Sequence, residues 1–181
     1  MRQDGGVVLR RFCREDVPAL TAMIHRAYAE LGALGLNFTG VDQPEDVTLK
    51  RAEGGPTWVL QENDALVACL TMSWPAEAAL AALTPQARVP GRAWLNQVAV
   101  DPAFRGKGAA SYLRDVGYAW CREQGATSIG LDTAEPAAHL RTIYSGWGFK
   151  EQDSIQWPGK RYRSVVMTRA LPEDVPEPRL R

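Results

Sequence analysis

The sequence predicts an α/β protein built on a mixed β-sheet, and three features of its pattern support this fold class. Apolar strands alternate with amphipathic helices over 93–146, which is typical of a βαβα unit with parallel strands. Two apolar runs joined by a short polar turn over 57–73 predict an antiparallel hairpin. Two further strand-like runs over 150–170 close the sheet. We expect one domain over 1–170, followed by a tail over 171–181 whose prolines and charges predict disorder.

The N-terminal third is expected to supply one strand and two helices. In chain order we expect a strand at 7–11, a helix from 17 to about 31, a glycine-punctuated loop at 32–40 and a polar helix at 44–53. Asp16 is the expected N-cap of the first helix, and Pro18 lies just inside it. Apolar residues recur along this helix at helical spacing, so one face should pack on the sheet. An acceptor pocket could be built in this region.

The rest of the chain follows the alternation of strands and helices. The expected elements are strands at 57–61 and 66–73, a helical turn at 76–83, a loop at 84–92, a strand at 93–100, a helix at 106–124, a strand at 128–133, a helix at 136–146, and strands at 150–157 and 162–170. The loop is expected because its segment holds two prolines and a glycine. No internal repeat interrupts the order.

Composition narrows the class of partner. Lys plus Arg and Asp plus Glu both number 21, so the formal charge is zero and favours neither a nucleic-acid nor an anionic-membrane partner. A small molecule or a peptide is the expected partner. Three cysteines without a CxxC pair, and two histidines, predict neither a disulfide framework nor a metal site. The start lacks the apolar core of a signal peptide, and no run approaches the roughly 18 apolar residues of a membrane span, so we expect a cytoplasmic protein.

The most informative stretch is the turn between the strand at 93–100 and the helix that follows it. The first N–H groups of a helix have no intrahelical acceptor and carry partial positive charge, so they can bind a phosphate. Gly106 and Gly108 lack Cβ atoms, which lets phosphate oxygens approach the backbone closely. Arg105 and Lys107 add positive charge beside the turn, and Ala110 is small. The turn therefore predicts a ligand that carries a diphosphate.

Two other interpretations of this turn are open. It could merely join a strand to a helix, or it could belong to a dinucleotide-binding fold. The second is disfavoured because GxGxxG is absent, since Gly106-Lys107-Gly108 is followed by Ala109-Ala110-Ser111. The turn also falls in the middle of the chain, with no complete doubly wound half before it. NAD is therefore not the expected ligand.

The turn also resembles the cofactor-binding signature of the GCN5-related N-acetyltransferase (GNAT) family. That signature is Arg or Gln, two residues, Gly, one residue, then Gly or Ala, and Arg105, Gly108 and Ala110 match it. The resemblance implies a sheet of about seven strands with about four helices, whose fourth and fifth strands splay apart. It also implies acetyl-CoA as the cosubstrate, and direct transfer of the acetyl group to an amine in a ternary complex.

The resemblance further implies which residues hold the cosubstrate. The diphosphate would lie on the turn, and the pantetheine arm would pair with backbone groups of the splayed strand at Val98 and Val100. The residues assigned to the cosubstrate in this way are Val98, Ala99, Val100, Arg105, Gly106, Lys107, Gly108, Ala109, Ala110 and Ser111.

A second part of the resemblance lies at 131–149 and points to a catalytic tyrosine. In this family the helix before a Gly-Phe pair commonly carries a tyrosine near the cofactor sulfur, and Tyr144 stands in that position before Gly148-Phe149. The asparagine that often precedes it by seven residues is replaced here by Ala137. A phenol with a pKa of about 10 can donate to a leaving thiolate without being ionised at neutral pH. Alternatively, the Tyr144 ring packs in the core and its hydroxyl bonds locally.

The base that would deprotonate the amine is not identified by the pattern. Many family members use a glutamate on the fourth strand, but 93–100 contains no Asp or Glu, and its polar residues are Asn96 and Gln97. A backbone N–H near Val98, at a bulge in the splayed strand, could donate to the developing oxyanion. The open candidates for the base are a water chain, Glu30, Asp42, Asp132 and His139. Asp132 could instead cap the helix that follows its strand.

Several questions stay open at the level of sequence. The acceptor could be a free amine metabolite, an aminoglycoside-like compound, an amino acid, or a protein N-terminus or lysine. Because the fourth strand lacks a carboxylate, the chain could also be an acyl-CoA-binding sensor or partner module of the same fold. The basic cluster of Lys160, Arg161 and Arg163 could meet a cofactor phosphate, but a solvated loop is the preferred interpretation. Exposed closing strands could support a homodimer.

Overall fold

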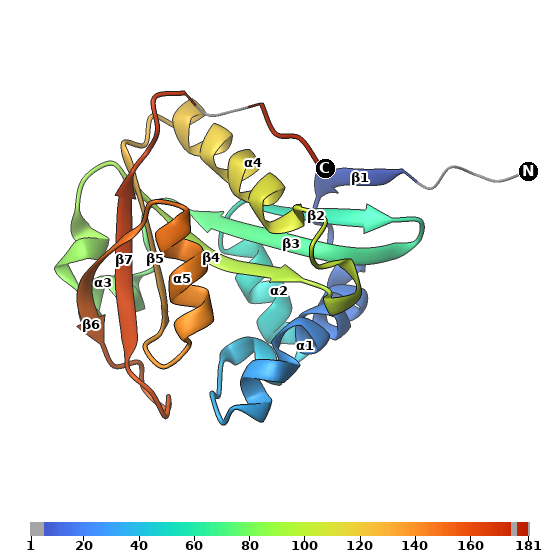
Figure 1. Ribbon diagram of the computed structural model, residues 1–181, viewed down its shortest axis with the longest axis horizontal. Helices are drawn as coiled ribbons and strands as arrows, with labels where there is room; N and C mark the ends of the chain where they lie inside the picture. The colour runs from blue at the N-terminus through green and yellow to red at the C-terminus, as the bar shows by residue number, and fades with distance from the viewer. Residues whose placement is uncertain (1–5, 175–176, 181) are drawn as a thin grey trace, which may run out of the picture.

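The computed structural model describes residues 6–174 and 177–180, and its central element is a seven-stranded sheet in the order β1-β2-β3-β4-β5-β7-β6 (Figure 1). The strands are β1 Val7–Arg11, β2 Thr57–Glu62, β3 Ala65–Ser73, β4 Arg92–Val100, β5 Ser128–Ala134, β6 Lys150–Ile155 and β7 Ser164–Ala170. The β4–β5 pair is parallel, and every other neighbouring pair is antiparallel. The predicted mixed sheet of about seven strands is confirmed.

The described residues contain five α-helices, where about four were expected. They are α1 Val17–Ala33, α2 Glu45–Glu53, α3 Ala78–Leu83, α4 Ala109–Glu123 and α5 Ala138–Gly146. The short α3 forms where the alanine-rich segment predicted only a helical turn. A 3-10 turn over Pro85–Arg88 lies in the segment expected as a loop, and the Thr84 side chain caps it by accepting from the backbone N–H of Gln86. No helix in the described ranges has the length and apolar content needed to cross a lipid bilayer.

The helices cover both faces of the sheet. Helix α4 lies on one side of β3 and β4, and helices α1 and α2 lie on the other side (Figure 1). On the α1 side, Met23 and Ile24 are fully buried and cluster with Cys69 of β3 and Ala99 of β4. On the α4 side, the core is a larger apolar cluster that also takes Tyr144 from α5. Burial of these two faces holds the sheet between the helices.

Asp16 occupies the predicted N-cap position of α1, but its side chain makes no capping hydrogen bond to the helix. A 3-10 turn over Arg14–Asp16 precedes the helix, and the Asp16 carboxylate accepts from the backbone N–H of Cys13 at 2.9 Å instead of capping α1. The same carboxylate receives two hydrogen bonds of 2.7 Å from the Arg10 guanidinium of β1. The sequence could not reveal this, because the partner of Asp16 lies in the preceding strand.

Strands β4 and β5 pair over only three residues each, as the resemblance implied for splayed strands. The pairing ends at Trp94 and Gly130. A Cβ atom at position 130 would lie 2.6 Å from the Trp94 ring, so the indole packs directly on the bare backbone of β5. A register shift against β3 between Leu95 and Gln97 places a bulge at Asn96, two residues before the position expected near Val98. Beyond Trp94, β4 has no strand partner on its β5 side among the described residues.

The chain after β7 continues along the α4 side of the sheet. The backbone N–H of Leu171 donates to the carbonyl of Thr127 at 2.9 Å, and Leu180 packs against the larger apolar cluster. The division into a domain over 1–170 and a disordered tail stays a prediction, and positions 175, 176 and 181 of that tail lie outside the described residues.

Candidate active site

A pocket of about 180 Å³ lies where β4 leads into α4. Its lining consists of Val100, Phe104, Arg105, Gly106, Gly108, Ala109, Ala110 and Ser111. Helix α4 begins at Ala109, three residues later than expected, because Gly106 and Gly108 have φ angles of +79° and +77°. Residues with a Cβ atom rarely adopt this left-handed conformation. The two glycines therefore set the backbone path of the turn, and their lack of Cβ atoms also leaves its backbone accessible.

The backbone of this turn is rich in free hydrogen-bond donors. The first amide of the segment with a partner is that of Tyr112, which donates to the carbonyl of Gly108 at 2.9 Å. The six consecutive N–H groups of 106–111 donate to no acceptor within the described part of the chain. Together with the helix dipole, these amides offer hydrogen-bond donors and partial positive charge of the kind that suits an anion.

The two cationic side chains expected beside this turn already have partners. Arg105 lines the pocket, but its guanidinium donates to Glu30 Oε2 at 2.8 Å and to the Ala27 carbonyl at 3.0 Å. Lys107 does not line the pocket; its Nζ lies 4.3 Å from the Phe104 ring centroid and 3.8 Å from a Glu62 carboxylate oxygen. Most of the attraction for an anion therefore comes from the backbone.

The three predicted β4 residues have different environments. Val100 lines the pocket. Ala99 is 4% exposed and its methyl packs in the α1 cluster, so only its backbone remains available to a ligand. The Val98 carbonyl accepts a 3.3 Å hydrogen bond from the hydroxyl of Tyr28, which reaches the splayed edge from α1. Tyr28 had been expected only as part of the sheet-packing face of its helix.

Tyr144 lies on α5 and is 8% exposed, packed against the rings of Trp147 and Phe149. Burial raises the pKa of its hydroxyl, and the neighbouring Tyr28 and Asp132 raise it further. The hydroxyl makes no hydrogen bond to any residue in the described ranges. Tyr144 therefore presents a neutral phenol that is free to donate a hydrogen bond.

Of the four side chains considered as bases, only Asp132 is partly buried beside the splay. Glu30 is paired with Arg105, and Asp42 and His139 are exposed. Asp132 lies on β5, and its Oδ2 accepts from the Trp157 indole N–H at 2.8 Å. Burial raises the pKa of this carboxyl. Asp132 does not cap α5, whose N-cap is Ala137.

The loop between β6 and β7 is not simply solvated as preferred from the sequence. Lys160 Nζ donates to the Asn37 carbonyl at 2.6 Å and to Thr39 Oγ1 at 3.0 Å. Asn37 in turn accepts from the Arg161 backbone N–H and donates to the Gly159 carbonyl. These bonds join the loop after α1 to the loop after β6, and no local sequence signal connects segments more than 120 residues apart.

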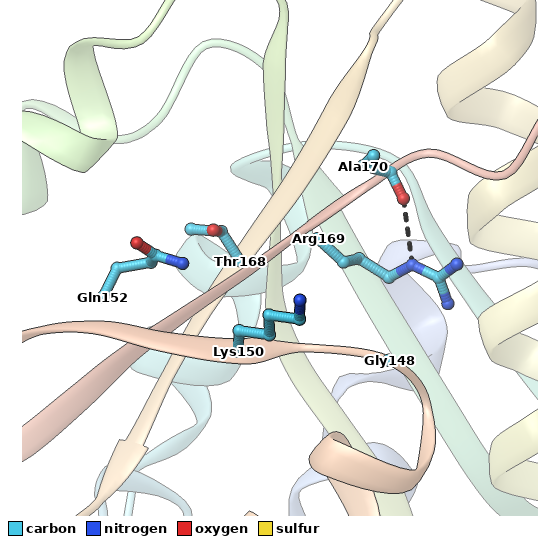
Figure 2. Close-up of a pocket in the computed structure, with 6 residues that line it drawn as sticks. All are labelled: Gly148, Lys150, Gln152, Thr168, Arg169 and Ala170. Carbon is cyan, nitrogen blue, oxygen red and sulfur yellow. Dashed lines mark hydrogen bonds between the residues drawn. The ribbon is translucent and has the colours of Figure 1, made fainter.

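A second pocket, of about 370 Å³, lies on the β6 and β7 strands (Figure 2). It is lined by Gly148, Lys150, Gln152, Thr168, Arg169 and Ala170. The Arg169 guanidinium donates to the Ala170 carbonyl at 3.0 Å and also to the carbonyl of Trp147. Tyr144, Asp132 and the free amides are not part of its lining, so it is separate from the candidate active site.

Solved structures share this fold. The ribosomal-protein-S18-alanine N-acetyltransferase of Escherichia coli superposes with a TM-score of 0.68 at 17% identity, covering 93% of this chain and 96% of that chain. PaiA N-acetyltransferase of Thermoplasma acidophilum, in complex with coenzyme A, gives 0.69 at 12% identity and covers 91% and 99%. A putative acetyltransferase of Salmonella typhimurium with acetyl-CoA gives 0.67 at 17% identity and covers 93% and 96%.

Comparison of the sequence with protein-family models identifies the family of this chain. Among proteins of curated function, none is detectably similar to this chain. The family model described as Acetyltransferase (GNAT) family matches residues 24–149, which is more than half of the chain; the match begins within α1 and ends just before β6. The match includes the glycine turn, both splayed strands and Tyr144. The chain therefore belongs to the GNAT family of acetyltransferases.

Proposed function

We propose that this protein is an N-acetyltransferase that uses acetyl-CoA as its cosubstrate and acetylates a primary amine in a ternary complex. The observation that carries the proposal is the run of six unpartnered amides over 106–111, placed beside the unpaired edge of β4. A diphosphate offers several anionic oxygens to such a run. Similar structures solved with coenzyme A or acetyl-CoA support the same ligand.

In this proposal the cosubstrate lies along β4 and ends at Tyr144. The diphosphate is held by the amides from Gly106 to Ser111, with Arg105 and Lys107 nearby. The pantetheine arm follows the unpaired edge of β4 and contacts the backbone from Val98 to Val100. The small side chains of Ala109 and Ala110 leave space over the turn.

Acetyl-CoA supplies a thioester, whose C–S bond breaks as the amine nitrogen forms the C–N bond. The acceptor ammonium loses two protons in all: one goes to a base and the other ends on the departing thiolate. We assign a protein group to each change in charge during the reaction. A backbone N–H near Val98 donates to the carbonyl oxygen as negative charge develops there. Tyr144 donates its phenol hydrogen bond to the leaving sulfur, and its raised pKa keeps it neutral in that role. Asp132 accepts a proton from the ammonium.

One observation favours the alternative of a non-catalytic acyl-CoA sensor. Strand β4 carries no carboxylate, and its buried Gln97 faces Gln43 at 3.5 Å instead of standing free for chemistry. A sensor would bind acetyl-CoA through the same turn and would not consume it.

The two functions separate in one experiment. Acetyl-CoA binding is measured by calorimetry, and thiol release is followed with a panel of primary amines. The proposal expects binding together with amine-dependent thiol release and an acetylated product in the mass spectrum. Binding without turnover on any amine would favour the sensor, and no binding would refute both functions.

A further inference from the structure

The two edges of the splay carry groups of opposite charge at matching positions. Trp94 and Gly130 form the last pair, so Asn96 of β4 and Asp132 of β5 each lie two residues beyond it. The Asn96 carbonyl accepts from the Arg51 guanidinium of α2 at 3.3 Å. Asp132 shares a face of β5 with Gly130, and its position is fixed by the bond from Trp157. A cation is thus held at one edge and a carboxylate at the other.

The orientation of Asp132 follows from the strand register. Trp94 pairs with Ser73, and Ala99 pairs with Cys69, two positions of β3 that lie on the same face. Cys69 and Ala99 pack against α1, so Trp94 and its β5 partner also face the side of α1 and α2. Asp132 therefore points to the side from which Arg51 approaches, opposite to α4 and α5.

A second cation comes from the joined loops. Lys160 is held by the Asn37 carbonyl and Thr39 Oγ1, neither of which carries a charge. Burial lowers the pKa of Lys160, and the charge of Arg51 lowers it further, whereas the charges of Asp42 and Asp132 raise it. Lys160 therefore interacts through space with both Arg51 and Asp132. Within the described residues, however, Arg51, Lys160 and Asp132 form no ion pair with one another or with any other group.

This arrangement lacks a partner with complementary charges. Two cations that repel each other, partly withdrawn from solvent, are stabilised by an anion between them. A nearby carboxylate without an ion pair is stabilised by a cation. The Arg51 guanidinium contacts of 3.3 and 3.5 Å to the Asn96 carbonyl and Gln43 Oε1 are long, which leaves donors for a carboxylate.

We propose that the acceptor is a small amino acid, whose ammonium contacts Asp132 and whose carboxylate lies between Arg51 and Lys160. This assignment rests on the proposed acetyl transfer and names its substrate class. It places the amine on the β5 edge of the splay, across from the Val98 backbone. A bare amine would satisfy Asp132 but would leave the two cations without an anion.

The test compares matched acceptors that differ only in the carboxylate. The purified full chain is supplied with acetyl-CoA and with the twenty L-amino acids, β-alanine and 4-aminobutyrate, each beside its carboxamide. Thiol release gives kcat and KM, and thermal shift in the presence of coenzyme A gives binding independently of turnover. We expect at least one amino acid to exceed its carboxamide in kcat/KM by about tenfold or more, mainly through KM.

Single substitutions then test which side chains bind the carboxylate and the ammonium of the acceptor. Arg51→Gln should remove the preference for the amino acid over its carboxamide, mainly by raising KM for the amino acid. Lys50→Gln, at the adjacent exposed position of α2, should leave the preference as in the parent. Asp132→Asn keeps an acceptor for the Trp157 indole and should lose turnover on amino acid and carboxamide alike.

Each outcome decides one question. Equal or better use of the carboxamides, or an unchanged preference in Arg51→Gln, would overturn the amino-acid assignment alone. Binding of acetyl-CoA with neither turnover nor thermal shift for any member of the panel would also overturn it, and would leave the cosubstrate assignment standing. Failure of the parent to bind acetyl-CoA would instead refute the proposed function.

Discussion

Arg105 and Glu30 join the glycine turn before α4 to helix α1, through a 2.8 Å bond between guanidinium and carboxylate. A second ion pair, between Arg26 of α1 and Asp101 at the end of β4, links the same two segments at 2.7 Å. Helix α1 and the turn before α4 are therefore held together by two ion pairs.

Replacing Glu30 with Gln should raise the affinity for acetyl-CoA by about two- to fivefold, because it frees the Arg105 guanidinium and removes a negative charge near the turn. Calorimetry at low and high salt checks this, and the gain should shrink at high salt. Glu53→Gln is the matched control, since it removes a similar exposed pair with Arg14. Unchanged affinity in Glu30→Gln would show that Arg105 stays bound to α1.

Replacing Gly106 with Ala should weaken acetyl-CoA binding, and Gly125→Ala should not. Both glycines have φ near +80°, and a Cβ at either would meet nothing within 4 Å. Each substitution should therefore lower the free energy of unfolding by about 1 kcal/mol in urea titrations. Only Gly106 lines the pocket. Equal affinity of the two variants for acetyl-CoA would argue against the turn as the diphosphate site.

Replacing Tyr144 with Phe should lower kcat by about 100-fold while leaving the affinity for acetyl-CoA unchanged, because only the donor to the leaving thiolate is lost. Tyr118→Phe is the matched control. Its hydroxyl is also buried and lacks a partner among the described residues, but it lies on α4. Removing that hydroxyl should leave kcat unaltered and should not reduce stability. A parent-like kcat in Tyr144→Phe would dismiss the proton-donor role.

Replacing Asp16 with Asn should cost about 2 kcal/mol of unfolding free energy at pH 7. The Arg10 guanidinium lowers the pKa of Asp16 from 3.8 to about 2, so the native state favours the ionised form. This stabilisation is complete above pH 4 and is lost as the pH falls from about 4 toward 2. Urea titrations of parent and variant should therefore converge over that range.

The control for that measurement is Glu123→Gln, at an exposed carboxylate that has no ion pair within the described part of the chain. Its unfolding free energy should follow the parent at every pH. A constant difference between Asp16→Asn and the parent from pH 7 to pH 2 would mean that the Arg10 contact does not set the acid limit of stability.

The local sequence pattern predicted which strands and helices form more accurately than it predicted where each one begins and ends. The strands and helices near the glycine turn follow from apolar periodicity, and the turn itself follows from Gly106 and Gly108. The start of α4 was placed too early because a propensity argument does not see the positive φ of Gly108. The N-cap position of Asp16 was predicted correctly, but its carboxylate bonds to Arg10 and to the Cys13 backbone, which local pattern does not reveal.

The side chains that we propose to bind the acceptor were the hardest to predict from the sequence. Arg51, Asp132 and Lys160 come from α2, β5 and the loop after β6, and each has an ordinary local context in the sequence. Their relation depends on where β4 and β5 stop pairing, which is a property of the whole sheet. Tyr144 could be singled out only through resemblance, since helical spacing alone assigns such a residue to the core.

The contact between Trp94 and Gly130 fixes where the sheet forks. Position 130 has no room for a methyl group, and the indole that fills this space is itself fully buried, so the branch point is anchored in the protein interior. Arg51 on helix α2 and Lys160 in the loop after β6 take no part in this contact. The segments around Arg51 and Lys160 could therefore be exchanged to suit a different acceptor, while the branch point of the sheet, where the cosubstrate is proposed to lie, stays in place.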